Sequence, residues 1–130
     1  MEVYDPQADS WQRVASMPQR VEDHAAAVMG GKIYVSGGDT YEGIVNSVCV
    51  YDPLADAWTQ LASMGIARRR HASVAVGGKL YAFGGNDGDD EYLSTAEVYD
   101  PASGSWAASG SWAQVTSFTS MRYNFAAAAV

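Results

Sequence analysis

The sequence predicts an all-β fold, an incomplete β-propeller built from four-stranded antiparallel blades. The stretch VYDPLADAW at residues 50–58 has near copies at residues 3–11 and 98–106. HAAAVMGGKIYVSGG at residues 24–38 matches HASVAVGGKLYAFGG at residues 71–85, a spacing of 47 residues. Apolar residues are not sustained at helical spacing over ten positions, so the repeated units are strands. A period of this length in strand-forming units is typical of propeller blades.

Each repeat contains four short segments rich in Val, Ile, Tyr and Trp, separated by glycine pairs or Asp-Pro turns, as β-strands are. We name these strands a, b, c and d in chain order. In the second repeat they are expected at 71–76, 79–83, 95–100 and near Trp106, with equivalents beginning at His24, Lys32, Ser47 and Ala57. The pair Gly77-Gly78 predicts a two-residue hairpin turn between strands a and b, and Asp-Pro predicts the turn between c and d. A four-stranded meander in each repeat is a propeller blade.

Several positions recur together. Glycine pairs end strand b at 37–38 and 84–85, Tyr-Asp-Pro closes strand c, Trp opens strand d, and Ser-Met follows at 16–17 and 63–64. In these positions nearly the whole chain resembles the kelch repeat. The resemblance implies a β-propeller whose paired glycines and large aromatic residues are structural, and whose usual role is binding other proteins.

The strand count divides the chain into unequal parts. We expect a half blade of strands c and d over 1–17, full blades over 18–64 and 65–118, and the first strand of another blade over 119–130. Neither end piece contains strand b, so the two cannot complete one blade, and propellers usually have four to eight blades. We therefore expect a fragment of a longer propeller, or a chain that associates with itself through its open blade faces.

The second full blade carries an insertion. SGSWAA at 103–108 is followed directly by SGSWAQ at 109–114, which indicates a six-residue tandem duplication at the c–d hairpin or the start of strand d. Trp106 keeps the distance from the preceding Tyr99, whereas Trp112 keeps the distance to the following repeat. Either tryptophan could occupy the aromatic position of the blade.

The composition excludes several classes of partner. Eight Lys and Arg residues against 15 Asp and Glu residues give a formal net charge of -7, which disfavours binding to nucleic acid or to anionic membranes. No apolar run has the length of a membrane span, and the first residues do not resemble a signal peptide. One cysteine, Cys49, cannot form an internal disulfide, so we expect a cytoplasmic protein.

Two kinds of loop are expected on one face of the blades, the d–a and b–c loops, and their sequences vary more than the Gly-Gly and Asp-Pro turns of the other face. Recognition is most plausible on variable loops that a rigid scaffold supports. We predict a partner-binding site there, formed by Tyr41, Glu42, Arg68, Arg69, Arg70, Asp87, Asp89, Asp90, Glu91, Tyr92 and Arg122.

The charged runs at 68–70 and 87–91 belong to one blade and should lie near each other. They could form solvated surface ion pairs, or a bipolar patch that orients a charged peptide. The resemblance implies that arginines at the position of Arg68 and Arg122 line the binding face, although Val21 stands there in the first full repeat. Tyr41 and Tyr92 could anchor a partner or pack within their own loops.

No catalytic, cofactor or metal site is predicted. His24 and His71 fall at equivalent points of adjacent blades, which indicates a shared structural role, and Phe125 stands at that point in the next repeat. Cys49 lies between two valines, a setting that raises a thiol pKa. The acidic run at 86–91 lacks the twelve-position ligand pattern of a calcium loop.

The leading hypothesis is a protein-interaction module that is not an enzyme and that binds a protein or peptide partner through the d–a and b–c loops. The alternative is a fragment of a kelch-like propeller enzyme or carbohydrate-binding protein, with tyrosines stacking on sugar rings. That alternative would require ligands that converge from more blades than this chain contains.

Overall fold

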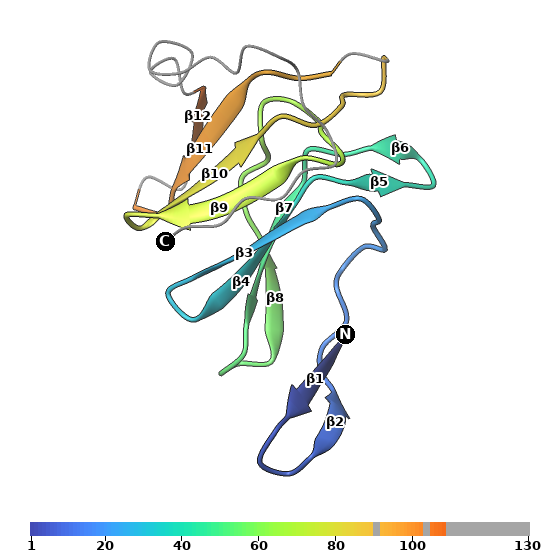
Figure 1. The fold of residues 1–130 in the computed structure, drawn as a ribbon, viewed down its shortest axis with the longest axis vertical. Coiled ribbons are helices and arrows are strands. Elements are labelled where there is room, and N and C mark those ends of the chain that lie inside the picture. The colour runs from blue at the N-terminus through green and yellow to red at the C-terminus, as the bar shows by residue number, and fades with distance from the viewer. Residues whose placement is uncertain (90–91, 103–104, 109–130) are drawn as a thin grey trace.

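The computed structural model describes residues 1–89, 92–102 and 105–108. Its two four-stranded sheets are antiparallel meanders, and no helix occurs among these residues. The first blade consists of β3 (Ala25–Met29), β4 (Lys32–Ser36), β7 (Val48–Asp52) and β8 (Ala57–Gln60). The second consists of β9 (Ala72–Val76), β10 (Lys79–Phe83), β11 (Ala96–Asp100) and β12 (Ser105–Ala108). The predicted all-β fold of four-stranded blades is confirmed (Figure 1).

Two hairpins lie outside the blades. β1 (Glu2–Asp5) pairs with β2 (Ser10–Arg13), which corresponds to the strands predicted at the start of the chain. β5 (Asp39–Thr40) pairs with β6 (Gly43–Ile44) inside the loop between β4 and β7, where the sequence had predicted no strand. Each of these strands has two residues, too few to show an alternating pattern. The strand expected within 119–130 lies outside the described residues, and the division at 17, 64 and 118 stays a prediction.

The repeated Tyr-Asp-Pro…Trp motif forms the turn between strands c and d. In the first blade Tyr51 lies opposite Trp58, with ring centroids 5.2 Å apart. The Tyr51 hydroxyl donates a 2.8 Å hydrogen bond to Asp56, which closes the turn at a positive φ of 47°. In the second blade the strand register places Trp106 opposite Tyr99, so Trp106 occupies the position that the sequence left open. Trp112 lies outside the described residues.

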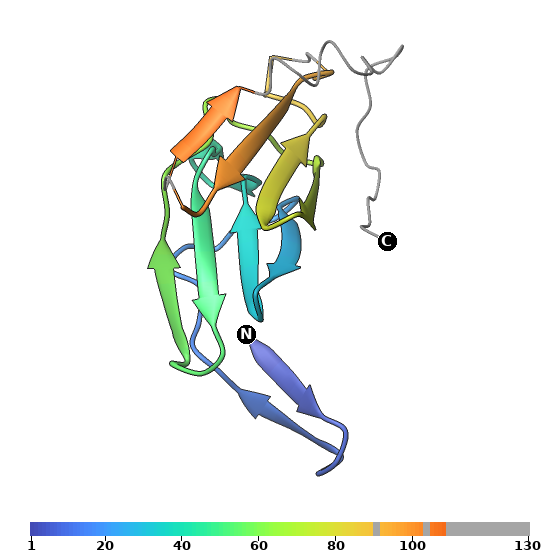
Figure 2. The ribbon, with the colours of Figure 1, turned by 90° about the vertical axis from the view of Figure 1, so that its left-hand side faces the viewer.

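The apolar core lies between the two blades, whose first strands β3 and β9 lie next to each other (Figure 2). Tyr34, Leu80 and Tyr99 form one buried cluster, and Leu80 is completely buried. Val48, Met64 and Ala82 form a second. Strand residues of one blade thus bury the side chains of the other, as expected when stacked repeats share a core.

The N-terminal hairpin has more exposed aromatic side chains than the blades. It is joined to the first blade by hydrogen bonds from Trp58 Nε1 to the Ala15 carbonyl, 3.0 Å, and from the Ala15 amide to Asp56, 2.8 Å. Trp11 is 68% exposed and Tyr4 is also exposed. The aromatic residues of this hairpin are therefore not part of a buried core, because no further strand packs on it among the described residues. Self-association through such faces stays a prediction.

The loops separate into two groups, as Figure 1 shows. The β4–β7 loop, with its hairpin, and the β10–β11 loop lie at one end of the sheets. The tight turns β3–β4, β7–β8 and β9–β10 lie at the other end. The d–a segment that leads from β8 to β9 joins the first group, since its residues hydrogen-bond to both of the long loops.

Gly37 lies very close to the backbone of the d–a segment. It has a φ of +59°, and an added Cβ would overlap the carbonyl oxygen of Arg68 and the ring of His71. Gly30, in the β3–β4 turn, has nearly the same φ of +58° with open space around it. Alanine substitutions at the two glycines therefore distinguish the cost of a left-handed backbone from the cost of steric overlap.

We expect Gly30→Ala to lower the free energy of unfolding by about 1 kcal/mol, the usual cost of a left-handed alanine. Gly37→Ala should lower it by at least about 2 kcal/mol more, because the backbone of the next segment must move. Urea denaturation of the two variants followed by circular dichroism measures the difference. Equal losses would show that the approach at Gly37 is not tight.

Candidate interaction site

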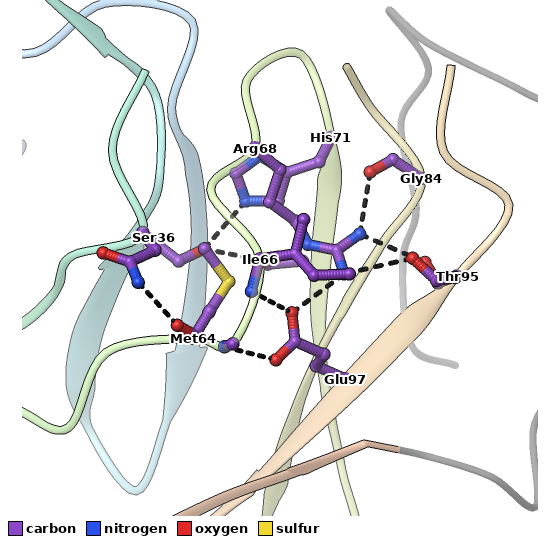
Figure 3. A network of polar contacts seen from close by, with 11 residues as sticks. Ser36, Met64, Ile66, Arg68, His71, Gly84, Thr95 and Glu97 are labelled. Atoms are coloured by element: carbon purple, nitrogen blue, oxygen red, sulfur yellow. Dashed lines mark hydrogen bonds and ion pairs between the residues drawn. The ribbon is translucent and has the colours of Figure 1, made fainter. Parts of the chain in front are cut away.

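The candidate site is built around the d–a segment that precedes β9. Arg68 lies in this segment, and its side chain is completely buried. Its Nη1 donates to the carbonyl oxygens of Gly84, at 2.9 Å, and Thr95, at 3.1 Å. Its Nη2 lies 2.9 Å from Oε2 of Glu97, which is itself buried (Figure 3). Arg68 therefore fills a slot inside the second blade, between the end of β10 and the start of β11.

Glu97 fixes the segment from the other side. Its Oε1 accepts a 2.6 Å hydrogen bond from the Gly65 amide, and its Oε2 accepts one of 3.2 Å from the Ile66 amide. One buried carboxylate thus satisfies two backbone donors and one guanidinium, as a buried charge requires. Gly65 leaves little room beside this carboxylate, since an added Cβ would come within 3.0 Å of it. The hydrogen bonds and the ion pair of Glu97, together with the close fit of Gly65, therefore hold the d–a segment against β11.

The backbone of the same segment binds the other blade. The Gly38 amide donates to the Arg68 carbonyl at 2.8 Å, and the Arg68 amide donates to Val45 at 3.3 Å. Asn46 Nδ2 donates to the Met64 carbonyl at 2.7 Å. Arg68 therefore contacts the first blade through its main chain and the second through its side chain.

The next two arginines form ion pairs with the first blade. Arg69 Nη1 lies 2.5 Å from Asp39, and Arg70 Nε lies 2.9 Å from Asp23. The sequence had predicted that the charged runs at 68–70 and 87–91 lie near each other. The Arg69 backbone pairs with Asn86, directly before the acidic run, whereas the ion pairs of Arg69 and Arg70 among the described residues are with acids of the preceding blade.

Arg68 corrects the predicted contact surface. A completely buried side chain with its donors directed at Gly84, Thr95 and Glu97 does not reach a partner on the loop face. The sequence alignment contained a signal that was missed. The repeat that has Arg68 in its d–a segment has Glu97 in its strand c. The preceding repeat has Val21 and Cys49 at the two equivalent positions. The two positions differ together between the repeats, as expected for residues that contact each other.

The other predicted residues lie on the loop face or outside the described part. Tyr41 is 94% exposed at the tip of the β5–β6 hairpin, and its hydroxyl donates to Glu42 at 3.0 Å. Tyr92 is 42% exposed, and Asp89 is exposed while Asp87 is half-buried. Asp90, Glu91 and Arg122 lie outside the described residues.

His71 lies at the centre of the blade interface. Its Nε2 is 3.0 Å from Ser36 Oγ, which is 2.9 Å from Ser73 Oγ. Burial, the nearby Arg68 charge and His24 lower the pKa of His71 to about 3. His71 is therefore neutral, and its Nδ1 has no hydrogen-bond partner among the described residues. His24 is exposed, so the two histidines do not share one environment as the repeat had predicted.

Other chemistry is sparse in the described part of the chain. Burial raises the pKa of the Cys49 thiol, as its apolar strand predicts. No group of three or more His, Cys, Asp or Glu side chains within residues 1–89, 92–102 and 105–108 could hold a metal ion. The same residues contain no helix of the length and apolar character that a membrane span needs.

Repeated antiparallel blades, a shared core between them and long loops gathered at one end define a segment of a β-propeller. The sequence profile of the KLHDC2/KLHL20/DRC7 Kelch-repeats domain matches residues 1–130, and the chain belongs to this family. The resemblance to the kelch repeat is thereby confirmed.

Two further proteins are similar to this chain, one in sequence and one in fold. Over 44 residues, 32% of this chain, the sequence is 46% identical to Kelch-like protein 21 of Mus musculus, and the match covers 7% of that protein. The fold is similar to the solved structure of YjhT, with a TM-score of 0.67 and 21% identity over 78% of this chain. The match covers 41% of the YjhT chain, so this chain spans only part of the length of each relative.

The buried ion pair predicts a non-additive response to substitution. Arg68→Met leaves the Glu97 carboxylate buried without its cation and should cost about 3 kcal/mol of unfolding free energy. Arg68→Met/Glu97→Gln should cost less than Arg68→Met alone, because the introduced glutamine is neutral and its single side-chain oxygen still accepts from the Gly65 amide, whose hydrogen bond is the shorter of the two. Urea denaturation of the four proteins in the cycle measures the coupling, and additive losses would contradict it.

His71 predicts a pH-dependent stability. Its pKa is depressed in the folded state and near 6.5 in the unfolded state, so the unfolded chain binds one more proton between these values. Stability is therefore unaffected above about pH 7 and falls as the pH decreases from 6.5 towards 3, by up to about 1.4 kcal/mol per pH unit from this group. His71→Phe should remove this slope, while His24→Phe should keep it. Parallel pH profiles for all three proteins would refute the assignment.

Proposed function

We propose that this kelch domain is a protein-interaction module that binds a protein or peptide partner through its d–a and b–c loops. The proposed contact residues are Tyr41, Glu42, Arg69, Arg70, Asp87, Asp89 and Tyr92, with Asp90, Glu91 and Arg122 retained from the sequence. The observation that carries the proposal is Tyr41, whose large side chain is 94% exposed on a loop that the blade positions. Large amphipathic side chains on a rigid support are typical anchors of protein interfaces.

The charges of this face support the same partner class. Arg70 keeps a side-chain exposure of 41% beside Asp23 at 35%, so both signs are accessible within one ion pair. Exposed pairs of this kind contribute little to stability but orient an approaching charged segment. The proposed activity is binding, with no catalytic step, and the cytoplasmic compartment stays a prediction from the sequence.

The blades hold the loops in place for this role. The d–a segment is fixed by Glu97 on one side and by the Gly38, Val45 and Asn46 contacts on the other. The β5–β6 hairpin is closed by Thr40, whose hydroxyl donates to the Gly43 carbonyl at 3.0 Å and accepts from the Glu42 amide at 3.1 Å. Such preorganised loops lose less conformational entropy when a partner binds.

A pair of photocrosslinking variants tests the face. Benzoylphenylalanine in place of Tyr41 reports the loop face, and the same residue in place of Leu54, which is 99% exposed in the β7–β8 turn, reports the opposite end. In an extract of the source organism we expect a defined protein adduct from position 41 and none from position 54.

The adduct must also depend on the proposed contacts. Excess unmodified chain should compete for it, and excess Tyr41→Ala/Arg70→Ala chain should not. Adducts from position 54 alone would move the interaction to the turn face.

A further inference from the structure

A cavity of about 210 Å³ lies in the first blade, where the segment entering β3 meets the ends of β4 and β7. Pro18 and Val21 line it from the segment, Gly37 and Ser47 from the two ends of the β4–β7 loop, and Cys49 from strand β7. At roughly 30 Å³ of liquid volume per water molecule, the cavity has room for the end of a side chain.

The repeat identifies what the cavity corresponds to. Val21 and Gly37 lie 47 residues before Arg68 and Gly84, and Ser47 and Cys49 lie 48 residues before Thr95 and Glu97. These four later residues are the arginine and the three residues that receive its hydrogen bonds in the second blade (Figure 3). The cavity is thus the counterpart of the arginine slot.

Two backbone segments border the slot, at Gly84 and Thr95 in the second blade and at Gly37 and Ser47 in the first, and we call them the backbone frame. The same hydrogen bond joins them in both blades. The Gly37 amide donates to the Ser47 carbonyl at 2.9 Å, and the Gly84 amide donates to the Thr95 carbonyl at 3.0 Å. In the second blade this frame also accepts two hydrogen bonds from Arg68 Nη1. Val21 has no hydrogen-bond donor in its side chain, so in the first blade the corresponding frame lacks that internal donor.

The charged groups of the slot are replaced together. Cys49 stands in place of Glu97, and Pro18 stands in place of Gly65, whose amide donates to that carboxylate. Proline has no amide hydrogen and needs no acceptor. The slot in the first blade is therefore neutral, since the cation, the anion and one of the two backbone donors that served the anion are missing.

We propose that this cavity binds a neutral primary amide, the end of a glutamine or asparagine side chain of the partner. A primary amide has two planar N–H donors, the kind of group that the same frame holds in the second blade. A guanidinium ion is disfavoured, because its charge would be buried without a carboxylate. This inference rests on the proposed function, and it names the chemistry that one part of the partner must present.

Three blocked tripeptides test the proposal on the full chain. They are acetyl-Ala-Gln-Ala-amide, acetyl-Ala-Arg-Ala-amide and acetyl-Ala-Leu-Ala-amide, which differ only in the central side chain. Saturation-transfer NMR titrations give their dissociation constants even when binding is weak. We expect the Gln peptide to bind about tenfold more tightly than the Leu peptide, from two hydrogen bonds of about 0.7 kcal/mol each.

Two substitutions connect the binding to the cavity. Cys49→Glu restores the carboxylate and should shift the preference from the Gln peptide to the Arg peptide. Val21→Arg supplies the internal side chain and should abolish binding of the Gln peptide. Val28→Arg adds the same charge at an exposed position of β3, 66% exposed, and should leave binding unchanged.

Equal binding of the three peptides, or binding that Val21→Arg does not alter, would overturn the proposal. A Cys49→Glu protein that still prefers the Gln peptide would overturn it as well. These results are separable from a failure of the proposed function. Specific adducts at position 41 without preference for the Gln peptide would refute the cavity alone, whereas peptide binding without adducts at position 41 would refute the loop face.

Discussion

The buried ion pair between Arg68 and Glu97 is the interaction on which the arrangement of the two blades depends. Its charges lie where water is excluded, so neither can be satisfied except by the other and by the backbone groups around them. The main chain of Arg68 also forms hydrogen bonds with Gly38 and Val45 of the first blade. Arg68 therefore contributes to the position of one blade relative to the other, and it cannot move without leaving the buried Glu97 carboxylate unpaired.

The same position beneath the b–c loop is occupied differently in the two blades. The second fills the space beneath its b–c loop with an arginine and balances the charge, whereas the first leaves a neutral cavity lined by Val21, Cys49 and Pro18. Replacing a buried ion pair by neutral residues is often tolerated when both charges are removed together. The repeat shows this concerted replacement within a single chain, with the glycine pairs and strand registers retained.

The sequence predicted the strands because their limits are set by local chemistry. Gly77-Gly78 and the Asp-Pro turns define hairpins without reference to the rest of the fold, and the observed β10 has the predicted bounds. The burial of Arg68 could not be predicted in this way, since it depends on Glu97, which lies 29 residues further along the chain. The pairing of Arg69 with Asp39 was missed for a similar reason, because it crosses between blades. Local motifs specify a blade, whereas contacts between blades depend on residues that the motif leaves variable.

The double role of Arg68 bears on how the chain folds during its synthesis. The backbone acceptors and donors that it uses in the first blade precede it in the sequence, so that blade can hold the arginine as soon as it emerges from the ribosome. Its counterion follows 29 residues later. Burial of the guanidinium before Glu97 is available would leave a charge unpaired away from water, which is costly. The burial of Arg68 therefore requires that β11, which carries Glu97, has joined the second blade.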